Sequence, residues 1–228
     1  MSADTTEIVL ENENIRAAFD GKTGALAGLT SKKTGWVIHR RSKLALSFRM
    51  QVPLPEQRAN HVYGQTQAAT SIEVDEDNSR IIFTWKDIES IHGGTLDIIF
   101  KGIVTLTDDG LAYEAEVENR SPYVIESVTW PCIGDLSIPH GAEKLERANI
   151  IYSQMKRGPL FPTFTSDMGY YGVDYPIQVV KTPETPFVLT ETGTEGLYTG
   201  YHDTTAEHMV SFTWELKPGF LYSENCQT

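Results

Sequence analysis

Apolar and polar residues alternate with a period of two along much of this chain. In the segment 111–119, LAYEAEVEN, every second residue from Leu111 to Val117 is apolar, and the residues between them are an alanine and two glutamates. Because successive side chains of a strand point to opposite faces, this pattern predicts a half-buried antiparallel strand. The segments 14–20, 43–52 and 80–87 repeat the pattern and predict further strands.

Turn-forming residues separate these segments. FDGKTGAL (19–26) contains Asp-Gly and Thr-Gly, and the polar runs 75–80 and 107–111 have the composition of hairpin loops. The best helical candidate, 139–149, is short and is either one helical turn or a loop. Short strands joined by tight turns therefore predict an all-β, antiparallel sandwich of two large sheets.

A length of 228 residues fits one large β domain. We see no internal repeat, low-complexity tract or linker, and expect a single domain over 1–228. The chain stops soon after its last strand-like run, so we expect either a piece of a longer protein or a separately encoded domain.

The formal net charge of −12 argues against binding to nucleic acid, since phosphate backbones require a basic surface. The N-terminus MSADTTEIVL has neither the positive nor the apolar region of a signal peptide, and no apolar run approaches the roughly 20 residues that span a bilayer. We expect a cytoplasmic protein that does not enter membranes, although a secreted protein trimmed of its leader would look the same.

The sequence offers no motif for a metal or a cofactor. Its two cysteines, Cys132 and Cys226, form either one bridge or two separate thiols. No Cys or His pair has structural-zinc spacing, and neither a glycine-rich phosphate loop nor a G-x-S-x-G serine motif occurs. We therefore expect neither a metal nor a cofactor.

The segment 153–186 departs from the alternating pattern, because five prolines and five aromatic residues share it. Long irregular segments in compact domains are often functional loops. Aromatic rings held in such loops are available to a ligand, so we predict that Tyr170, Tyr171 and Tyr175 contact one. The tryptophans, in contrast, lie in strand-like runs and are expected in the core.

The string EGLYTGYHDTT (195–205) places a His–Asp pair at the end of a strand. We predict that Tyr201, His202 and Asp203 contact a ligand; the competing interpretation is a turn in which Asp203 accepts hydrogen bonds from the residues after it. Adjacent strand residues point to opposite faces, so His202 and Asp203 cannot easily act as a catalytic dyad.

Other histidines are weaker candidates for chemistry. The residues considered for proton transfer are His202, His140 and Glu191, and none is predicted with an assigned role. His61 and Tyr63 share one strand face, as a base and an acid would, but an edge-strand surface is the simpler interpretation. His92 precedes Gly-Gly and is expected in a turn.

Three segments resemble known carbohydrate-related proteins. The opening IVLENENIRAAFDGKTGALAGLTSKKTGWVI (8–38) resembles the first strands of galactose-mutarotase-like supersandwich domains. VENRSPYVIESVTWPCIGDL (117–136) and EGLYTGYHD (195–203) look like the N-terminal domain of bacterial glycoside-hydrolase-like proteins, in which a supersandwich precedes a (β/α)8 barrel. The resemblance implies a supersandwich fold and a carbohydrate ligand.

The chain also departs from the catalytic members of these groups. It does not match the histidine motif of the enzymatic mutarotases or their glutamate near the C-terminus. It lacks the helical domain of the related polysaccharide lyases and the barrel that carries the carboxylates of the glycosidases.

We therefore expect an accessory, carbohydrate-associated domain of a glycoside-hydrolase-like protein, with catalytic residues outside this chain, on a (β/α)8 domain in cis or in trans. The alternatives are a free-standing enzyme, like an aldose 1-epimerase or a polysaccharide lyase, and a structural domain without a sugar ligand.

Overall fold

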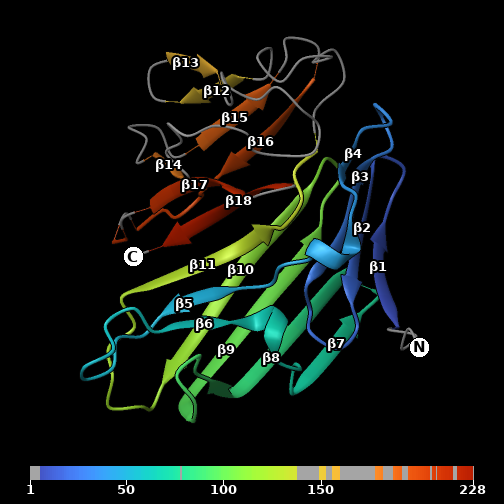
Figure 1. The fold of residues 1–228 in the computed structure, drawn as a ribbon. Coiled ribbons are helices and arrows are strands. Elements are labelled where there is room, and N and C mark those ends of the chain that lie inside the picture. Colours follow the sequence, from blue (N-terminus) through green and yellow to red (C-terminus); the bar gives the residue numbers. More distant parts are fainter. Residues whose placement is uncertain are drawn as a thin grey trace.

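The computed structural model of the chain is built from antiparallel strands, as the alternating pattern predicted (Figure 1). It describes residues 6–77, 79–137, 149–152, 156–159, 178–181, 187–191, 195–205, 207–208, 210–217 and 220–227. The predicted segment 139–149 lies almost wholly outside these residues.

Two four-stranded sheets come from the first half of the chain. The N-terminal sheet has the order β1-β2-β3-β4 and consists of β1 (Glu7–Glu11), β2 (Ile15–Asp20), β3 (Leu26–Ser31) and β4 (Val37–His39). The rear sheet has the order β10-β9-β8-β7 and consists of β7 (Ser71–Asp75), β8 (Arg80–Glu89), β9 (Thr95–Leu106) and β10 (Leu111–Asn119).

Two further sheets combine early and late strands. The front sheet has the order β14-β17-β18-β11-β5-β6 and consists of β5 (Arg49–Gln51), β6 (His61–Tyr63), β11 (Ser127–Ile133), β14 (Gln178–Lys181), β17 (Val210–Lys217) and β18 (Phe220–Gln227). The upper sheet has the order β13-β12-β15-β16 and consists of β12 (Asn149–Tyr152), β13 (Lys156–Pro159), β15 (Phe187–Glu191) and β16 (Gly196–Gly200).

Short helical turns complete the described structure. They are the 3-10 helices η1 (Ser42–Leu44) and η2 (Gly64–Thr66). Among the described helices, neither has the length and apolar character needed to cross a membrane.

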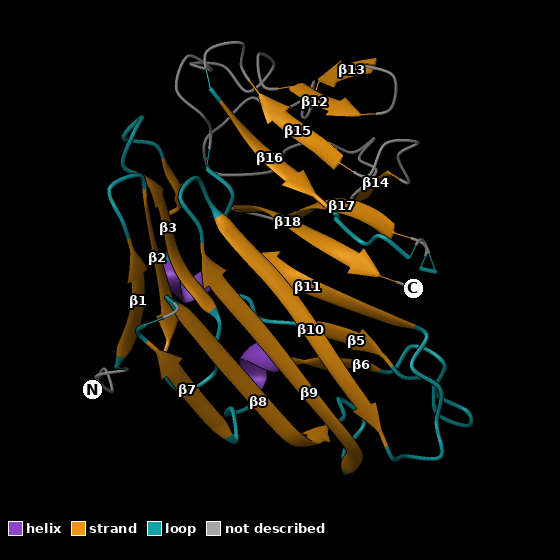
Figure 2. Ribbon diagram, turned by 180° about the vertical axis from the view of Figure 1, so that it is seen from behind, coloured by secondary structure: helices purple, strands orange, loops and turns teal. Residues whose placement is uncertain are grey.

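The sheets are arranged in layers around one core. In Figure 1, β5, β6 and β11 of the front sheet lie before the rear sheet, and the N-terminal sheet stands beside them. Seen from behind, the outer face of the rear sheet is not covered by another described element (Figure 2). The core fills the space on the inner face of β8, where the N-terminal sheet and the front sheet meet the rear sheet.

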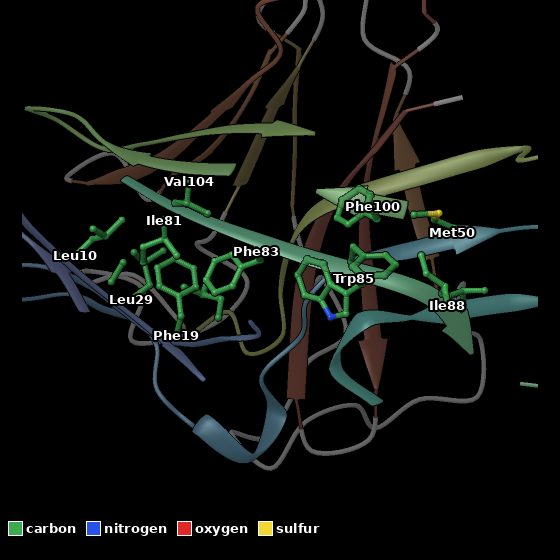
Figure 3. Close-up of a cluster of buried hydrophobic side chains, with 14 of the residues drawn as sticks. Leu10, Phe19, Leu29, Met50, Ile81, Phe83, Trp85, Ile88, Phe100 and Val104 are labelled. Carbon is green, nitrogen blue, oxygen red and sulfur yellow. The ribbon is translucent and has the colours of Figure 1, made fainter. Parts of the chain in front are cut away.

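Alternation along β8 turns its apolar residues into this space. Ile81, Phe83 and Trp85 are fully buried, and Figure 3 shows them lying along the strand between residues of the N-terminal sheet and of β5. Phe83 meets Phe19 of β2 with ring centroids 5.5 Å apart, and Trp85 meets Phe48 at 4.9 Å. One row of side chains therefore joins three sheets.

The β2–β3 hairpin follows from its turn chemistry. The Asp20 carboxylate accepts hydrogen bonds from the backbone N–H of Lys22 (2.9 Å) and of Thr23 (2.7 Å). Gly24 then adopts a φ of +63°, which glycine tolerates best. The turn packs closely on the core, since a Cβ at Gly24 would lie 2.8 Å from Phe83.

A pair of asparagines ties the first hairpin to a distant one. Asn12 donates its side-chain amide to the carbonyl of Thr107 and Asn14 donates to that of Asp108, each at 2.8 Å. The two asparagines precede β2, and the two residues that accept their hydrogen bonds follow β9. The amides therefore form an asparagine clamp between the β1–β2 turn and the β9–β10 turn.

Two predicted strands differ from the observed ones. In the segment 43–52, η1 and an irregular stretch precede β5, and only Arg49–Gln51 pair as a strand. In β10, Val117 keeps 40% of its surface exposed, although it lies on the inward side. The reason is that β10 is the outer strand of the rear sheet, so its end is covered on one flank only.

Candidate functional site

An exposed aromatic surface lies on the outer face of β15 and β16. The register pairs Phe187 with Gly200 and Leu189 with Tyr198, so the four residues share one face. The opposite face carries Val188, which is fully buried in the core. The rings of Phe187 and Tyr198 stack with centroids 5.6 Å apart and an interplanar angle of 28°.

His202 extends this surface beyond the end of β16. Tyr198, Gly200 and His202 are spaced by two residues, and the Tyr198 hydroxyl lies 3.3 Å from Nε2 of His202. A Cβ at Gly200 would overlap the Tyr198 ring, so the absence of a side chain lets the ring lie against the backbone. Tyr198 keeps 52% of its surface exposed. We name Phe187, Tyr198 and His202 the aromatic shelf.

The neighbours of His202 in the sequence do not join the shelf. Tyr201 is partly buried and packs against the hydrophobic core. Asp203 accepts hydrogen bonds from the backbone N–H of Thr205 (2.8 Å) and from its hydroxyl (2.7 Å). These bonds, together with His208 at 3.6 Å, hold the pKa of Asp203 below its usual range. Asp203 therefore forms the turn that was the competing interpretation.

Glu191 lies on the same face as the shelf but far from His202. It is 6% exposed and pairs in register with Gly196. His202 follows Gly196 by six positions, which corresponds to about 20 Å in an extended chain. The structure does not bring these two candidates together.

Four predicted residues cannot be placed. His140, Tyr170, Tyr171 and Tyr175 lie outside the described residues. The ligand contacts of the three tyrosines remain predictions, and His140 remains a candidate without an assigned role.

A separate, polar surface lies on the outer face of the front sheet. The register pairs Arg49 with Tyr63 and Gln51 with His61, while Met50 between them is fully buried. The rings of His61 and Tyr63 have centroids 6.1 Å apart. Burial, and next the positive charge of Arg49, hold the pKa of His61 below its usual range, so its imidazole is neutral at pH 7.

Sequence reasoning found His61 and Tyr63 but missed Arg49. The available signal was the alternation around Met50, which places Arg49 and Gln51 on the face opposite the core. Pairing with β6 could not be inferred from that signal. β6 is an edge strand of the front sheet, as the simpler interpretation of His61 and Tyr63 supposed.

The other aromatic and histidine predictions concern structure. Trp36 and Trp85 are buried as expected. Trp130 lies over Gly102 and donates to the carbonyl of Glu114 at 3.1 Å. His92 occupies the β8–β9 turn, where its backbone N–H donates to Ser90. Within the described ranges, no three His, Cys, Asp or Glu side chains gather to hold a metal ion.

Comparison with known proteins identifies the architecture. No protein-family model and no curated protein matches the chain. A galactose mutarotase related enzyme from Lactobacillus acidophilus has a similar structure, with a TM-score of 0.56 and 11% identity over 97% of this chain and 84% of that chain. A galactose mutarotase-like protein from Lactobacillus casei gives a TM-score of 0.51 at 10% identity over 97% of this chain and 87% of that chain. The chain has a galactose-mutarotase-like fold.

Proposed function

We propose that this chain is an accessory carbohydrate-associated domain of a glycoside-hydrolase-like protein and that it binds sugar on the aromatic shelf. Catalysis would belong to a (β/α)8 domain in cis or in trans. The fold it shares with proteins described as galactose mutarotase-like supports the carbohydrate class. The observation that carries the proposal is the stacked, half-exposed Tyr198 beside His202.

The shelf has the mixed chemistry that a sugar requires. A pyranose presents a C–H face, which packs on an aromatic ring, and a rim of hydroxyls, which need donors and acceptors. Ligand sites combine apolar surface with a few polar groups that fix orientation. The rings of Phe187 and Tyr198 supply the apolar surface. The Tyr198 hydroxyl and the His202 imidazole supply the polar groups.

The shelf lacks the arrangement of an acid–base site. A general base works within hydrogen-bond reach of its partner. Asp203 is engaged by Thr205, and Glu191 pairs with Gly196 at the start of β16, whereas His202 follows the end of that strand. Among the described residues, the polar group within reach of His202 is the phenol of Tyr198. Binding without proton transfer is the function that this geometry supports best.

Binding measurements test the proposal. Titration calorimetry with neutral oligosaccharides of several linkages should give a saturable signal that Tyr198→Ala weakens by about tenfold to a hundredfold, the range for a central aromatic contact. Ile91→Ala is the matched control, because Ile91 is 53% exposed and Tyr198 52%. For His202→Ala the control is His92→Ala, in the exposed β8–β9 turn. Equal binding by Tyr198→Ala and wild type would refute the shelf.

A free-standing sugar-active enzyme is the second candidate. The observation in its favour is His61, which is neutral at pH 7 and shares a face with Tyr63 and Arg49. NMR should follow the interconversion of anomerically pure aldoses and the elimination reaction of uronate-containing oligosaccharides. If wild type converts a sugar and His61→Gln does not, the enzyme is favoured, with His61 in its site. If His202→Ala loses that conversion instead, the chemistry takes place at the aromatic shelf. No conversion by wild type, with saturable binding, favours the accessory role.

A further inference from the structure

The segment 135–137, which leaves β11, is fastened to the edge of the N-terminal sheet. Leu136 forms an antiparallel bridge with His39, and the backbone N–H of Ser137 donates to the carbonyl of Ile38 at 2.8 Å. The Ser137 hydroxyl accepts from the indole of Trp36 at 3.1 Å and donates to the carbonyl of Val37. These contacts connect β4 with the chain that emerges from the front sheet.

An ion pair closes the same contact. Arg41 donates its backbone N–H to Oδ2 of Asp135 at 2.8 Å, and its guanidinium donates to Oδ1 through Nε (3.1 Å) and Nη2 (2.6 Å). The Asp135 side chain is 3% exposed. Burial acts to raise the pKa of Asp135, but the hydrogen bonds from Arg41 and its positive charge outweigh burial and hold this pKa below its usual range.

His39 lies inside this contact with its ring unsatisfied. It is 1% exposed, and neither ring nitrogen makes a hydrogen bond of good geometry with the described residues, although backbone groups of Ala27 and Leu44 lie near the ring. Burial of a polar group without a partner is unfavourable, so such a group calls for an explanation. No element of the aromatic shelf or of the front-sheet surface uses this imidazole.

The groups around the ring come from three elements. The backbone of Ala27 in β3 and of Leu44 in η1 lies close enough to favour a charged ring, and Asp135 acts on it as a negative charge. Lys43 of η1 is exposed to solvent. Burial outweighs these effects and holds the pKa of His39 below its usual range, so the imidazole is neutral when the contact is closed.

We propose that His39, Arg41 and Asp135 form an acid-sensitive latch that holds segment 135–137 on β4 and opens when His39 takes up a proton. The neutral ring fits the closed contact, because it needs no solvation there. The protonated ring needs water or a free carboxylate, and Asp135 is already engaged by Arg41. Opening the contact hydrates the imidazolium and separates Trp36 from Ser137.

The direction of the pH effect follows from linkage. A base whose pKa is lowered in the closed state binds its proton more tightly when the contact is open. The latch is therefore fully stable above about pH 6.5, the usual value for histidine, and weakens as the pH falls below it. One proton changes the closed-to-open ratio by at most about tenfold per pH unit.

The Trp36 indole reports directly on the latch. Its N–H signal in the full chain should be followed by NMR from pH 7.5 to pH 4.5, with solvent exchange normalised to free tryptophan. We expect protection of the Trp36 indole to fall by up to about tenfold per pH unit below the His39 midpoint. The Trp130 indole, which donates a hydrogen bond to the backbone carbonyl of Glu114, is the internal reference and should keep its protection.

Variants separate His39 from the other titrating groups. His39→Gln should remove the pH response of the Trp36 indole, whereas the control His61→Gln, which replaces a partly buried imidazole whose pKa is also lowered, should retain it. A response that survives in His39→Gln, or a constant Trp36 signal down to pH 4.5, overturns the latch. If His39→Gln does not fold, the Cε1 proton of His39 in wild type decides, since its midpoint must coincide with the Trp36 transition.

Discussion

Gly24 and Gly200 both lie beneath aromatic rings, Gly24 in the core and Gly200 at the surface. Gly24 meets Phe83 and Trp85, both fully buried, and a Cβ there would lie 2.8 and 2.9 Å from their rings. Gly200 lies beneath Tyr198, which is 52% exposed. The same contact between a ring and a bare backbone therefore serves packing in one region and presentation of a ring to solvent in the other.

Burial decides which of these roles a ring has. A fully buried aromatic side chain gains its transfer free energy on folding, about 25 cal/mol per Å² of apolar surface. A half-exposed ring leaves much of that free energy unrealised, and a ligand that covers the ring recovers it. The core pair should dominate stability, and the shelf should dominate binding.

The largest expected effect is on the core. Phe83→Ala removes a fully buried ring that packs on Phe19, and should lower the free energy of unfolding by about 3–5 kcal/mol, as for other buried aromatic truncations. Tyr198→Ala should change it by less than about 1 kcal/mol, as for exposed positions. Urea unfolding followed by tryptophan fluorescence measures both values, and similar losses in the two variants would contradict the comparison.

The Gly24 contact should also be sensitive to one methyl group. Gly24→Ala combines a positive φ with overlap against Phe83, and should cost roughly 2–4 kcal/mol. Gly35 is the matched control, because its φ is +75° and a Cβ there would meet nothing within 4 Å. Gly35→Ala should cost only about 1 kcal/mol in the same denaturation experiment. Equal costs would show that backbone strain, not ring contact, sets the effect at Gly24.

Acid should distinguish the two regions as well. Asp135 and Asp203 both have a lowered pKa, so the unfolded chain binds their protons more tightly, and each contribution is lost as the pH falls below about 3.8. Only Asp135 is buried, and Asp135→Asn should cost about 2 kcal/mol at pH 7, the scale of a hydrogen bond to a charged group.

Unfolding curves at pH 7 and pH 3 measure this difference. The Asp135→Asn penalty should shrink at pH 3, whereas Asp203→Asn should leave the midpoint nearly unchanged at both values. A penalty for Asp135→Asn that is independent of pH would mean that shape, not charge, explains it.

The smallest effect on stability should accompany a clear effect on binding. Gly200→Ala displaces the Tyr198 ring from the backbone but leaves the core intact, so unfolding should change by less than about 1 kcal/mol. Affinity for the oligosaccharide that wild type binds should fall severalfold in calorimetry. Unchanged affinity would show that the position of the ring on Gly200 does not matter.

The core was accessible from sequence because its signal is local. Alternation within 80–87 assigned Phe83 and Trp85 to one face, and the Asp-Gly and Thr-Gly steps located the β2–β3 turn. The alternation also places Tyr198 and His202 on one face of a strand, whereas the ligand contacts predicted in this segment were Tyr201, His202 and Asp203.

The composition of the shelf was less accessible, because it depends on pairing between strands. Nothing local to Phe187 shows that it lies opposite Gly200, since the register of β15 and β16 sets that contact. His39 is a similar case. Its burial depends on the bridge to Leu136, nearly a hundred positions away, which no periodic pattern encodes.

The asparagine clamp has a consequence for synthesis. Asn12 leaves the ribosome 95 residues before Thr107, the residue it must bond. At about 5–20 residues per second, this delay is roughly 5–20 s. β8 is synthesised before Thr107, so the apolar side of β2 awaits it for only part of that interval. Until β8 emerges, the nascent hairpin presents Phe19 to solvent, where a chaperone that recognises exposed apolar segments would shield it.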